Sequence, residues 1–516
     1  MTERAEIDIV ALVVYTVLVT PCWNVSQNGF DQKMSAAKHV LLVNYFFPPM
    51  MGGGVPRPVK MAKYLRQLGW DVTVLTVHGA GQIDRRLSLD GVARTVRVHE
   101  WPLGWLLKVV GGLVRLMRRA SERLTQRGLG SSTLDRGFAY EEQEIESSKI
   151  GWILPALSAA LRGPPIDVAV VSLPPAASGT VGWLLNRLRG VPYLVEYRDP
   201  WTVGAFWTSD ADGRPRADVV TRARYRLTRR LEATLLQRSA GAIIVNGEAH
   251  VARLAAAFPD QTLGKPIVHI RNGVDLDDTA TDPEPDAPAG VLRLLHTGFF
   301  YHFYTPHQLI GALRLTQHRS PESLDGVEVE FMGSGFPEQL VEELDGWGLG
   351  QLVRRTAAGT YSDALSAMRR ADGLIAILPA LESNYDRLPT KIYEYLSTDR
   401  PILVVADPNG AASELLAGTP DVVVADNSSQ QTIADAFAAF VRLTRRRRAE
   451  GYPAENGKRG EPHHYLQRAI EMDSCLHQVL SSRAGPATSR KRLSDPISGG
   501  RGPSGTACHR IRDSAD

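Results

Sequence analysis

The chain alternates short apolar runs with helical segments, and this alternation restricts its fold more than any other feature. An apolar run at 39–46 is followed by a glycine-rich loop, an amphipathic segment at 57–69 and a second apolar run at 70–77. Such units place parallel strands between covering helices, so both faces of the sheet are buried. The sequence therefore predicts a doubly wound α/β domain over residues 38–276. Its further strands and helices are expected at 167–173, 176–190, 192–197, 241–246, 247–258 and 266–273.

A second alternating series follows residues 277–290, a stretch rich in proline and aspartate that we interpret as an interdomain linker. Because 516 residues exceed what one ordinary core accommodates, a second domain is expected on length alone. We place it at residues 291–440 and predict two Rossmann-like, doubly wound domains that face a cleft. Its strands and helices are expected at 292–298, 327–335, 361–371, 372–379, 389–397 and 400–406.

Three segments outside this pattern have other compositions. Residues 1–37 are expected to be a disordered, dispensable extension, because the apolar run at 9–19 is about half of the ~20 residues that a membrane-spanning helix needs. A weak signal or anchor is the alternative, and Met34 is a candidate start. Residues 441–481 are expected to form a C-terminal helical segment. The tail at 482–516 is poor in apolar residues and is predicted to be disordered.

Residues 101–150 interrupt the first domain with an apolar, tryptophan-containing stretch that ends in basic residues. One interpretation is a helix at 101–119 that lies peripherally on the inner membrane surface, beside a lipid-linked substrate. The other is a helix packed on the sheet with a solvated arginine face.

Composition excludes several classes of function. Hydrophobic content of 43% and charged content of 22% are typical of a soluble globular protein, and a net charge of +3 gives no field suited to nucleic acid. The three cysteines lie far apart and form neither a disulfide framework nor a zinc site, so a reducing cytoplasm is expected. No cluster of histidine and acidic residues has metal-ligand spacing.

The first chemical motif is the glycine run Gly52–Gly54, between a strand and a helix. Glycines permit close backbone approach, and the free amides of the following helix attract an anion. Neither a phosphate-binding loop nor a dinucleotide fingerprint completes the motif. A flexible turn is the alternative.

The second motif is "EYRDPW", residues 196–201, at the carboxyl end of a buried strand. Ligands of open α/β sheets bind at this end, so Arg198 and Asp199 are expected to face the cleft. The alternative is an Arg198–Asp199 ion pair that caps the sheet.

The third motif lies between the apolar runs "LIAIL" and "PILVV". Pro389 suits a first helical turn, and Lys391 and Glu394 then share one helical face. Asp386 precedes them, near the positive end of the helix. A surface pair is the alternative, but a position between two buried strands favours a ligand site at the mouth of the sheet.

With these motifs in order, residues 39–440 resemble a family 4 glycosyltransferase of GT-B fold. The resemblance rests on "YFFPPMMGGG", "VVSLPP", "YLVEYRDPW", "IRNGVD", "FMGSG" and "YDRLPTKIYEYL". The last is similar to an acid–x7–acid signature in which both acids are usually glutamate; here Asp386 takes the first place and Glu394 the second.

The resemblance implies residue roles. Glu394 would bind the ribose of a nucleotide sugar, and Asp386 would hold sugar hydroxyls or support the oxocarbenium ion. Lys391 would face the phosphates, while Arg198 and Asp199 would face the acceptor. Donor-binding residues would be Lys391, Pro389, Thr390, Arg387, Gly298, Gly333, Gly335, Gly52, Gly53 and Gly54.

The resemblance also implies retaining transfer of a hexosyl-type sugar to a glycan, lipid-linked or small-molecule acceptor. The nucleotide sugar is a co-substrate, and neither a cofactor nor a metal is expected. One departure concerns residues 296–306, where the family usually carries an arginine and a lysine. Here His302, among aromatic residues, is the one side chain that could carry a positive charge in their place. Arg387 or Lys391 would then have to compensate for the missing arginine and lysine.

Two other functions are compatible with the sequence. A nucleotide-sugar epimerase shares the fold, although the "PTKIYEYL" signature and the tryptophan-rich insertion argue against it. A non-catalytic scaffold that binds nucleotide sugars is the other alternative, supported by the aromatic residues at 299–304.

Overall fold

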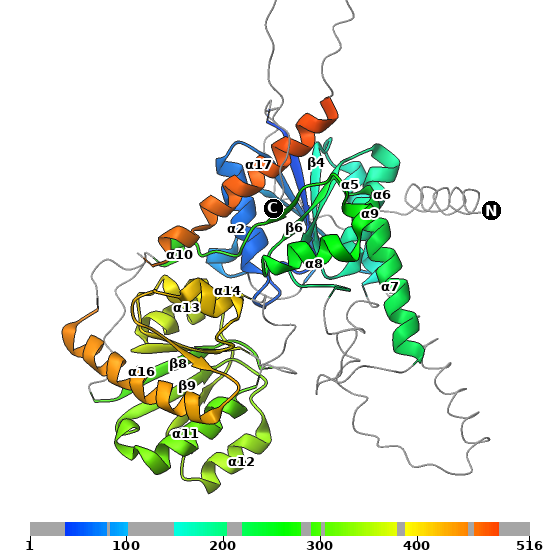
Figure 1. Cartoon of the computed structure of the whole chain (residues 1–516). Helices are drawn as coiled ribbons and strands as arrows, with labels where there is room; N and C mark the ends of the chain where they lie inside the picture. The colour runs from blue at the N-terminus through cyan, green and yellow to red at the C-terminus, as the bar shows by residue number, and fades with distance from the viewer. Residues whose placement is uncertain are drawn as a thin grey trace, which may run out of the picture.

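The computed structural model contains two parallel β-sheets, each covered by helices on both faces (Figure 1). The two doubly wound domains predicted from the sequence are confirmed. The described residues are 37–79, 83–101, 149–203, 219–279, 290–300, 305–378, 388–452 and 459–484. Most of the predicted N-terminal extension, the insertion and the tail lie outside these ranges.

The first sheet has seven parallel strands in the order β3-β2-β1-β4-β5-β6-β7. In β1, Val40 and Leu42 enter one core cluster while Leu41 and Val43 enter the other, so a continuous apolar run fills both faces. The strands are β1 (His39–Val43), β2 (Asp71–Val77), β3 (Arg94–Val98), β4 (Val168–Leu173), β5 (Tyr193–Tyr197), β6 (Gly241–Ile244) and β7 (Ile267–His269).

Helices cover this sheet on both sides, with α5, α6 and α7 on one face and α2 on the other. They are α2 (Pro56–Gln67), α5 (Ile150–Arg162), α6 (Ala176–Arg189), α7 (Val219–Arg238), α8 (Ala249–Ala257), α9 (Pro259–Thr262) and α10 (Leu276–Thr279), with a 3-10 turn at Arg85–Leu87.

The second sheet has six parallel strands in the order β10-β9-β8-β11-β12-β13. They are β8 (Leu292–Thr297), β9 (Val327–Met332), β10 (Val353–Thr356), β11 (Gly373–Ile377), β12 (Ile402–Ala406) and β13 (Val422–Asp426). The helices are α11 (His307–Arg319), α12 (Glu338–Gly346), α13 (Tyr361–Arg370), α14 (Thr390–Leu396), α15 (Ala411–Leu416) and α16 (Gln430–Glu450), with a 3-10 turn at Pro321–Ser323.

Each sheet reverses its strand order at one place, between β1 and β4 in the first domain and between β8 and β11 in the second. Loops that leave neighbouring strands in opposite directions open a crevice there, and ligands of open α/β sheets bind at such switch points. The motif Gly52–Gly54 follows β1, and the stretch with Lys391 and Glu394 follows β11.

The chain returns to the first domain through α17 (Tyr465–Ala484), which a 3-10 turn at Glu461–His463 precedes. In Figure 1 this helix crosses the first domain beside α2. Tyr465 and Leu476 are buried there, and the Trp70 indole donates a hydrogen bond to Asp473 at 2.7 Å. The C-terminal segment therefore completes the core of the N-terminal domain.

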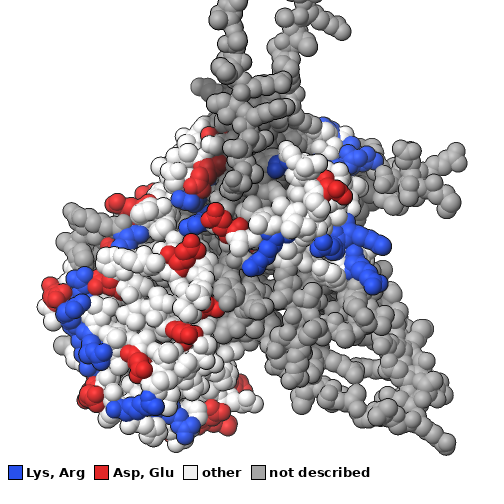
Figure 2. Space-filling model, in the orientation of Figure 1, with Lys and Arg blue, Asp and Glu red and all other residues white. Residues whose placement is uncertain are grey.

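The basic cluster Arg445–Arg448 lies at the C-terminal end of α16, which runs without interruption across residue 440. Figure 2 shows basic side chains at this outer edge, interspersed with acidic ones. Arg447 pairs with Asp421, and Arg448 contacts Asp372 at 3.2 Å. These arginines serve the packing of α16. Within the described residues, we find no helix both long and apolar enough to span a membrane.

Candidate active site

Helix α14 brings the two charged residues of the third motif to the switch point of the second sheet. Pro389 caps the helix in an extended conformation, and the apolar side chains of the short helix are buried beneath it. Lys391 is half-buried, whereas Glu394 retains only 7% of its accessible surface. Neither is the solvated surface pair of the alternative interpretation.

Lys391 lies against the end of β8. Its Nζ is 3.5 Å from Nε2 of His296. A Cβ on Gly298 would stand 2.8 Å from Nζ of Lys391. Gly298 has a φ of +123°, a conformation that favours glycine. Burial lowers the pKa of Lys391 to about 8, against the opposing attraction of Glu394. The site therefore holds a poorly solvated ammonium close to the backbone of 298.

Glu394 is a buried carboxyl group in a mixed electrostatic environment. Burial raises the pKa of Glu394 to about 7, although Lys391 opposes the shift. Asp278 of the first domain adds to the rise, and a hydrogen bond with Tyr361 counters it. A carboxyl group shielded from water in this way can accept hydrogen bonds from a ligand.

The first domain meets α14 through its own switch-point loop. The Thr390 hydroxyl donates a hydrogen bond to the Gly53 carbonyl at 3.0 Å. A Cβ on Gly54 would lie 2.5 Å from a guanidinium nitrogen of Arg198, so the glycine leaves room for that side chain. Gly52 has a φ of +141° and no neighbour within 4 Å of its Cβ position. The loop therefore needs glycine for conformation and for the close approach of Arg198.

Arg198 and Asp199 each have a separate partner. The Arg198 guanidinium donates to the Pro174 carbonyl at 2.7 Å and lies 5.2 Å from the centre of the Phe46 ring. Asp199 accepts a hydrogen bond from Asn246 at 2.9 Å. Burial lowers the pKa of Arg198, with Asp199 opposing the shift. Arg198 thus bridges the ends of β4 and β5 beside the glycine loop.

The glycines of "FMGSG" contact the backbone that follows β8. A Cβ on Gly333 would lie 1.7 Å from the Gly298 carbonyl oxygen, and one on Gly335 would lie 1.9 Å from that of Phe300. The Phe300 amide donates to the Ser334 carbonyl at 2.8 Å. This packing by itself requires glycine at 333 and 335, so these glycines do not on their own indicate a diphosphate.

Asp386, Arg387 and His302 lie outside the described residues. The first acid of the acid–x7–acid signature and one of the two candidate compensating cations are therefore not placed. Their roles stay predictions, and the described part of the site rests on Lys391, Glu394 and the two switch-point loops.

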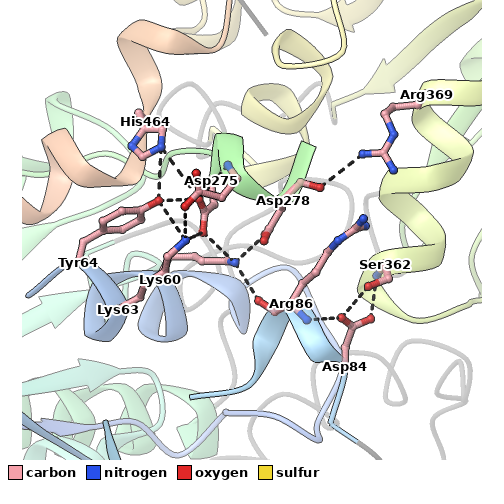
Figure 3. A network of polar contacts seen from close by, with 11 residues as sticks. Lys60, Lys63, Tyr64, Asp84, Arg86, Asp275, Asp278, Ser362, Arg369 and His464 are labelled. Atoms are coloured by element: carbon pink, nitrogen blue, oxygen red, sulfur yellow. Dashed lines mark hydrogen bonds and ion pairs between the residues drawn. The ribbon is translucent and has the colours of Figure 1, made fainter. Parts of the chain in front are cut away.

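An ionic network that the sequence reasoning missed holds the end of the first domain against α2 (Figure 3). Lys60 on α2 contacts Asp275 at 3.0 Å and Asp278 at 2.6 Å, and all three are buried. Tyr64 donates to Asp275, which also pairs with Lys63 at 2.8 Å. Burial raises the pKa of Asp278 to about 6, although Lys60 opposes the shift. The network anchors the start of the interdomain linker.

A contact between the two domains lies beside this network, as Figure 3 shows. The Asp84 carboxylate accepts hydrogen bonds from the Ser362 amide and hydroxyl at 2.8 and 2.7 Å, at the first turn of α13. Lys60 also donates to the Arg86 carbonyl at 2.8 Å. Asp84 and Ser362 are separated by 278 residues, so no local pattern in the sequence links them.

Two further buried polar sites lie near strand ends. Arg57 in the first turn of α2 pairs with Glu196 at the end of β5, Nε to Oε1 at 3.0 Å. His296, the penultimate residue of β8, has 2% of its surface exposed. In the sequence, both sites could have been found as charged or titratable residues inside otherwise apolar runs. Within the described ranges, no group of three or more histidine, cysteine or acidic side chains is arranged to hold a metal ion.

Comparison with known proteins identifies the first domain. Residues 52–273 match the family model described as a glycosyl transferase 4-like domain, which spans the glycine loop, Arg198 and the strands of the first sheet after β1. Residues 52–273 therefore form a glycosyl transferase 4-like domain. No curated protein sequence matches the chain.

Solved structures show that the chain has the GT-B fold. Sucrose-phosphate synthase from Thermosynechococcus elongatus is 14% identical, with a TM-score of 0.54 over 86% of this chain and 100% of that one. Trehalose 6-phosphate synthase from Burkholderia multivorans is 13% identical, with a TM-score of 0.53 over 87% and 100%. The catalytic domain of starch synthase IV from Arabidopsis thaliana, bound to ADP and acarbose, is 12% identical, with a TM-score of 0.54 over 87% and 100%.

Proposed function

We propose that this glycosyltransferase moves a sugar, with retention of anomeric configuration, from a nucleoside diphosphate to a glycan, lipid-linked or small-molecule acceptor. The observation that carries the proposal is the meeting of the two switch points: the hydrogen bond from Thr390 to Gly53 brings Lys391 and Glu394 opposite the glycine loop. A donor lying between the domains would contact both loops.

The residue chemistry suits each part of such a donor. The buried carboxyl group of Glu394 would accept hydrogen bonds from ribose hydroxyls. The ammonium of Lys391 would contact the diphosphate, where negative charge develops as the glycosidic bond breaks. Arg198 and Asp199, beside the glycine loop, would bind the acceptor. Asp386 would stabilise the cationic sugar.

The proposed step balances without a metal or other cofactor. The bond from the anomeric carbon to the donor phosphate oxygen breaks, and a bond to the acceptor oxygen forms on the same face. The leaving phosphate takes the acceptor proton. Lys391 offsets the growing charge on the phosphate, and the buried setting strengthens that interaction.

Donor binding should follow a bell-shaped pH profile. Glu394 accepts from both ribose hydroxyls best when ionised, so binding should strengthen as the pH rises through about 7. Lys391 loses its charge as the pH rises through about 8, so binding should weaken above that value. Calorimetric titration of the preferred nucleoside diphosphate between pH 5.5 and 10, chosen to span both groups, measures the profile. Affinity that is flat across this range would count against both assignments.

A donor screen followed by product analysis tests the function. UDP-, GDP-, TDP- and ADP-sugars are first screened by thermal shift, where a ligand at 100 times its Kd stabilises by about 2.7 kcal/mol. The best donor is then incubated with and without acceptors, and the anomeric configuration of the product is read by NMR. A retained glycoside supports the proposal. Epimerised donor without acceptor would indicate an epimerase, and binding without turnover would indicate a scaffold.

Location stays part of this proposal. We expect the enzyme to act in the cytoplasm, with residues 101–119 in peripheral contact with the inner membrane surface; all but the first of these residues lie outside the described ranges. Flotation of the enzyme with vesicles containing anionic lipid, compared with a variant lacking 102–119, tests that contact.

A further inference from the structure

His296 is a polar ring enclosed by apolar ones. It stacks on Phe300 with ring centroids 4.9 Å apart and planes 9° from parallel, and Phe331 lies 5.8 Å away. Only 2% of its surface is exposed. A buried imidazole is costly unless its nitrogens have partners, so its two contacts define what the residue does.

Those two contacts fix one tautomer. Nδ1 lies 2.9 Å from the Ile375 carbonyl oxygen, which can only accept, so Nδ1 carries the proton. Nε2 then presents a lone pair toward the ammonium of Lys391, 3.5 Å away, which is long for a hydrogen bond. Burial and the adjacent Lys391 lower the pKa of His296, so the ring stays neutral. His296 is an acceptor aimed at a cation.

The ammonium of Lys391 lies close to the backbone at the end of β8. Gly298 provides the room beside the ammonium, because a Cβ there would stand 2.8 Å from Nζ. The ammonium has three N–H groups, and His296 takes one of them. The segment from 296 to 306 contains no arginine or lysine, so the end of β8 supplies no cation of its own.

We propose that His296 is a positioning residue for the donor site, which holds the ammonium of Lys391 so that its remaining N–H groups meet the diphosphate. This inference rests on the proposed function, because it needs a diphosphate at Lys391. In this arrangement β8 contributes the hydrogen-bond acceptor and α14 contributes the cation. Lys391 then supplies the positive charge that the end of β8 lacks.

Two substitutions separate the two hydrogen bonds of the ring. In His296→Asn, the amide can still donate to the Ile375 carbonyl but does not reach Lys391. In His296→Gln, the longer side chain can place its oxygen near the former Nε2. We expect His296→Asn to raise the donor KM about tenfold, as for loss of a hydrogen bond to a charged group, and to leave the acceptor KM unchanged. His296→Gln should recover most of that loss.

A purely structural role predicts a different pattern. Equal losses in both variants, or equal rises in donor and acceptor KM, would overturn the proposal. In a Lys391→Ala background, His296→Asn should add no further loss of donor affinity, because its effect runs through the ammonium. An additional tenfold loss there would also overturn it.

A readout without nucleotide separates this inference from the proposed function. The pH dependence of Lys391 modification by an amine-reactive acylating reagent, followed by mass spectrometry, reports the pKa of that amine. His296→Asn should lower this pKa, because the buried ammonium loses its acceptor, while His296→Gln should stay near the parent value. Identical profiles in all three proteins would refute the positioning role. Failure of every nucleotide to bind, with these shifts present, would refute the donor assignment alone.

Discussion

Replacing Glu394 with glutamine should stabilise the unliganded enzyme while it abolishes donor binding. The glutamate has 7% of its surface exposed and a pKa of about 7, compared with an ordinary value of 4.5. At pH values above about 7 the folded protein must hold a buried carboxylate that the unfolded chain would solvate. Glutamine has nearly the same shape and no charge, so it removes this cost.

The magnitude follows from the shift in pKa. A rise in the pKa of Glu394 from 4.5 to about 7 corresponds to about 3 kcal/mol, at roughly 1.36 kcal/mol for each tenfold change in proton affinity. Because the folded-state pKa of Glu394 is raised, its contribution to stability is fully present below pH 4.5 and is lost as the pH rises through about 7. The Glu394→Gln advantage should therefore be near zero at pH 4.5 and reach about 2–3 kcal/mol at pH 8.5.

Differential scanning calorimetry at the two pH values measures this difference. For a domain of this size, a gain of 2–3 kcal/mol corresponds to a rise in Tm of roughly 4–10 °C. Glu342→Gln, which removes an exposed carboxylate from α12, is the matched control and should change Tm equally little at both pH values. In the same samples, the thermal shift caused by the donor should vanish for Glu394→Gln only.

Two outcomes would refute this reasoning. If Glu394→Gln lowered Tm at pH 8.5, the carboxylate would be a structural element of the fold and not a group held ready for a ligand. If the variant kept the donor-induced shift, Glu394 would not bind the ribose.

Three further predictions concern the interface, the glycine turn and the acceptor side. Lys60→Met should destabilise the enzyme by about 3–5 kcal/mol, since it leaves the buried Asp275 without its central cation; chemical denaturation measures this, and a loss under 1 kcal/mol would contradict it. Gly335→Ala should cost at least 1–3 kcal/mol in thermal melts, because of its φ of +80° and the contact with the backbone at 300, whereas Gly346→Ala, with no neighbour within 4 Å, should be close to neutral. Arg198→Met should raise the acceptor KM about tenfold and change the Kd for nucleoside diphosphate less than twofold; the reverse pattern in steady-state kinetics and calorimetry would move Arg198 to the donor site.

The fold was predictable because its signal is local. Buried parallel strands need apolar residues on both faces, so runs such as Val40 to Val43 stand out without any knowledge of contacts. The loops at the switch points follow from the order of strands and helices. The position of Lys391 and Glu394 between two such strands was therefore visible in the sequence.

The contacts around the site were not predictable in the same way. Lys60 on α2 meets Asp275 at the far end of the same domain, and α17 packs on the first domain although it follows the second. The glycines at 333 and 335 look like a ligand turn in the sequence, but backbone packing against 298–300 already accounts for them. The partners of His296 come from α14 and β11, 79 residues or more away.

The most direct measurement of the central claim is a crystal structure of the enzyme with the nucleoside diphosphate that gives the largest thermal shift. We expect ribose hydroxyls within hydrogen-bonding distance of Glu394 and diphosphate oxygens at the Lys391 ammonium, with His296 still behind it. A nucleotide bound at full occupancy elsewhere, with Glu394 and Lys391 free of it, would contradict these assignments.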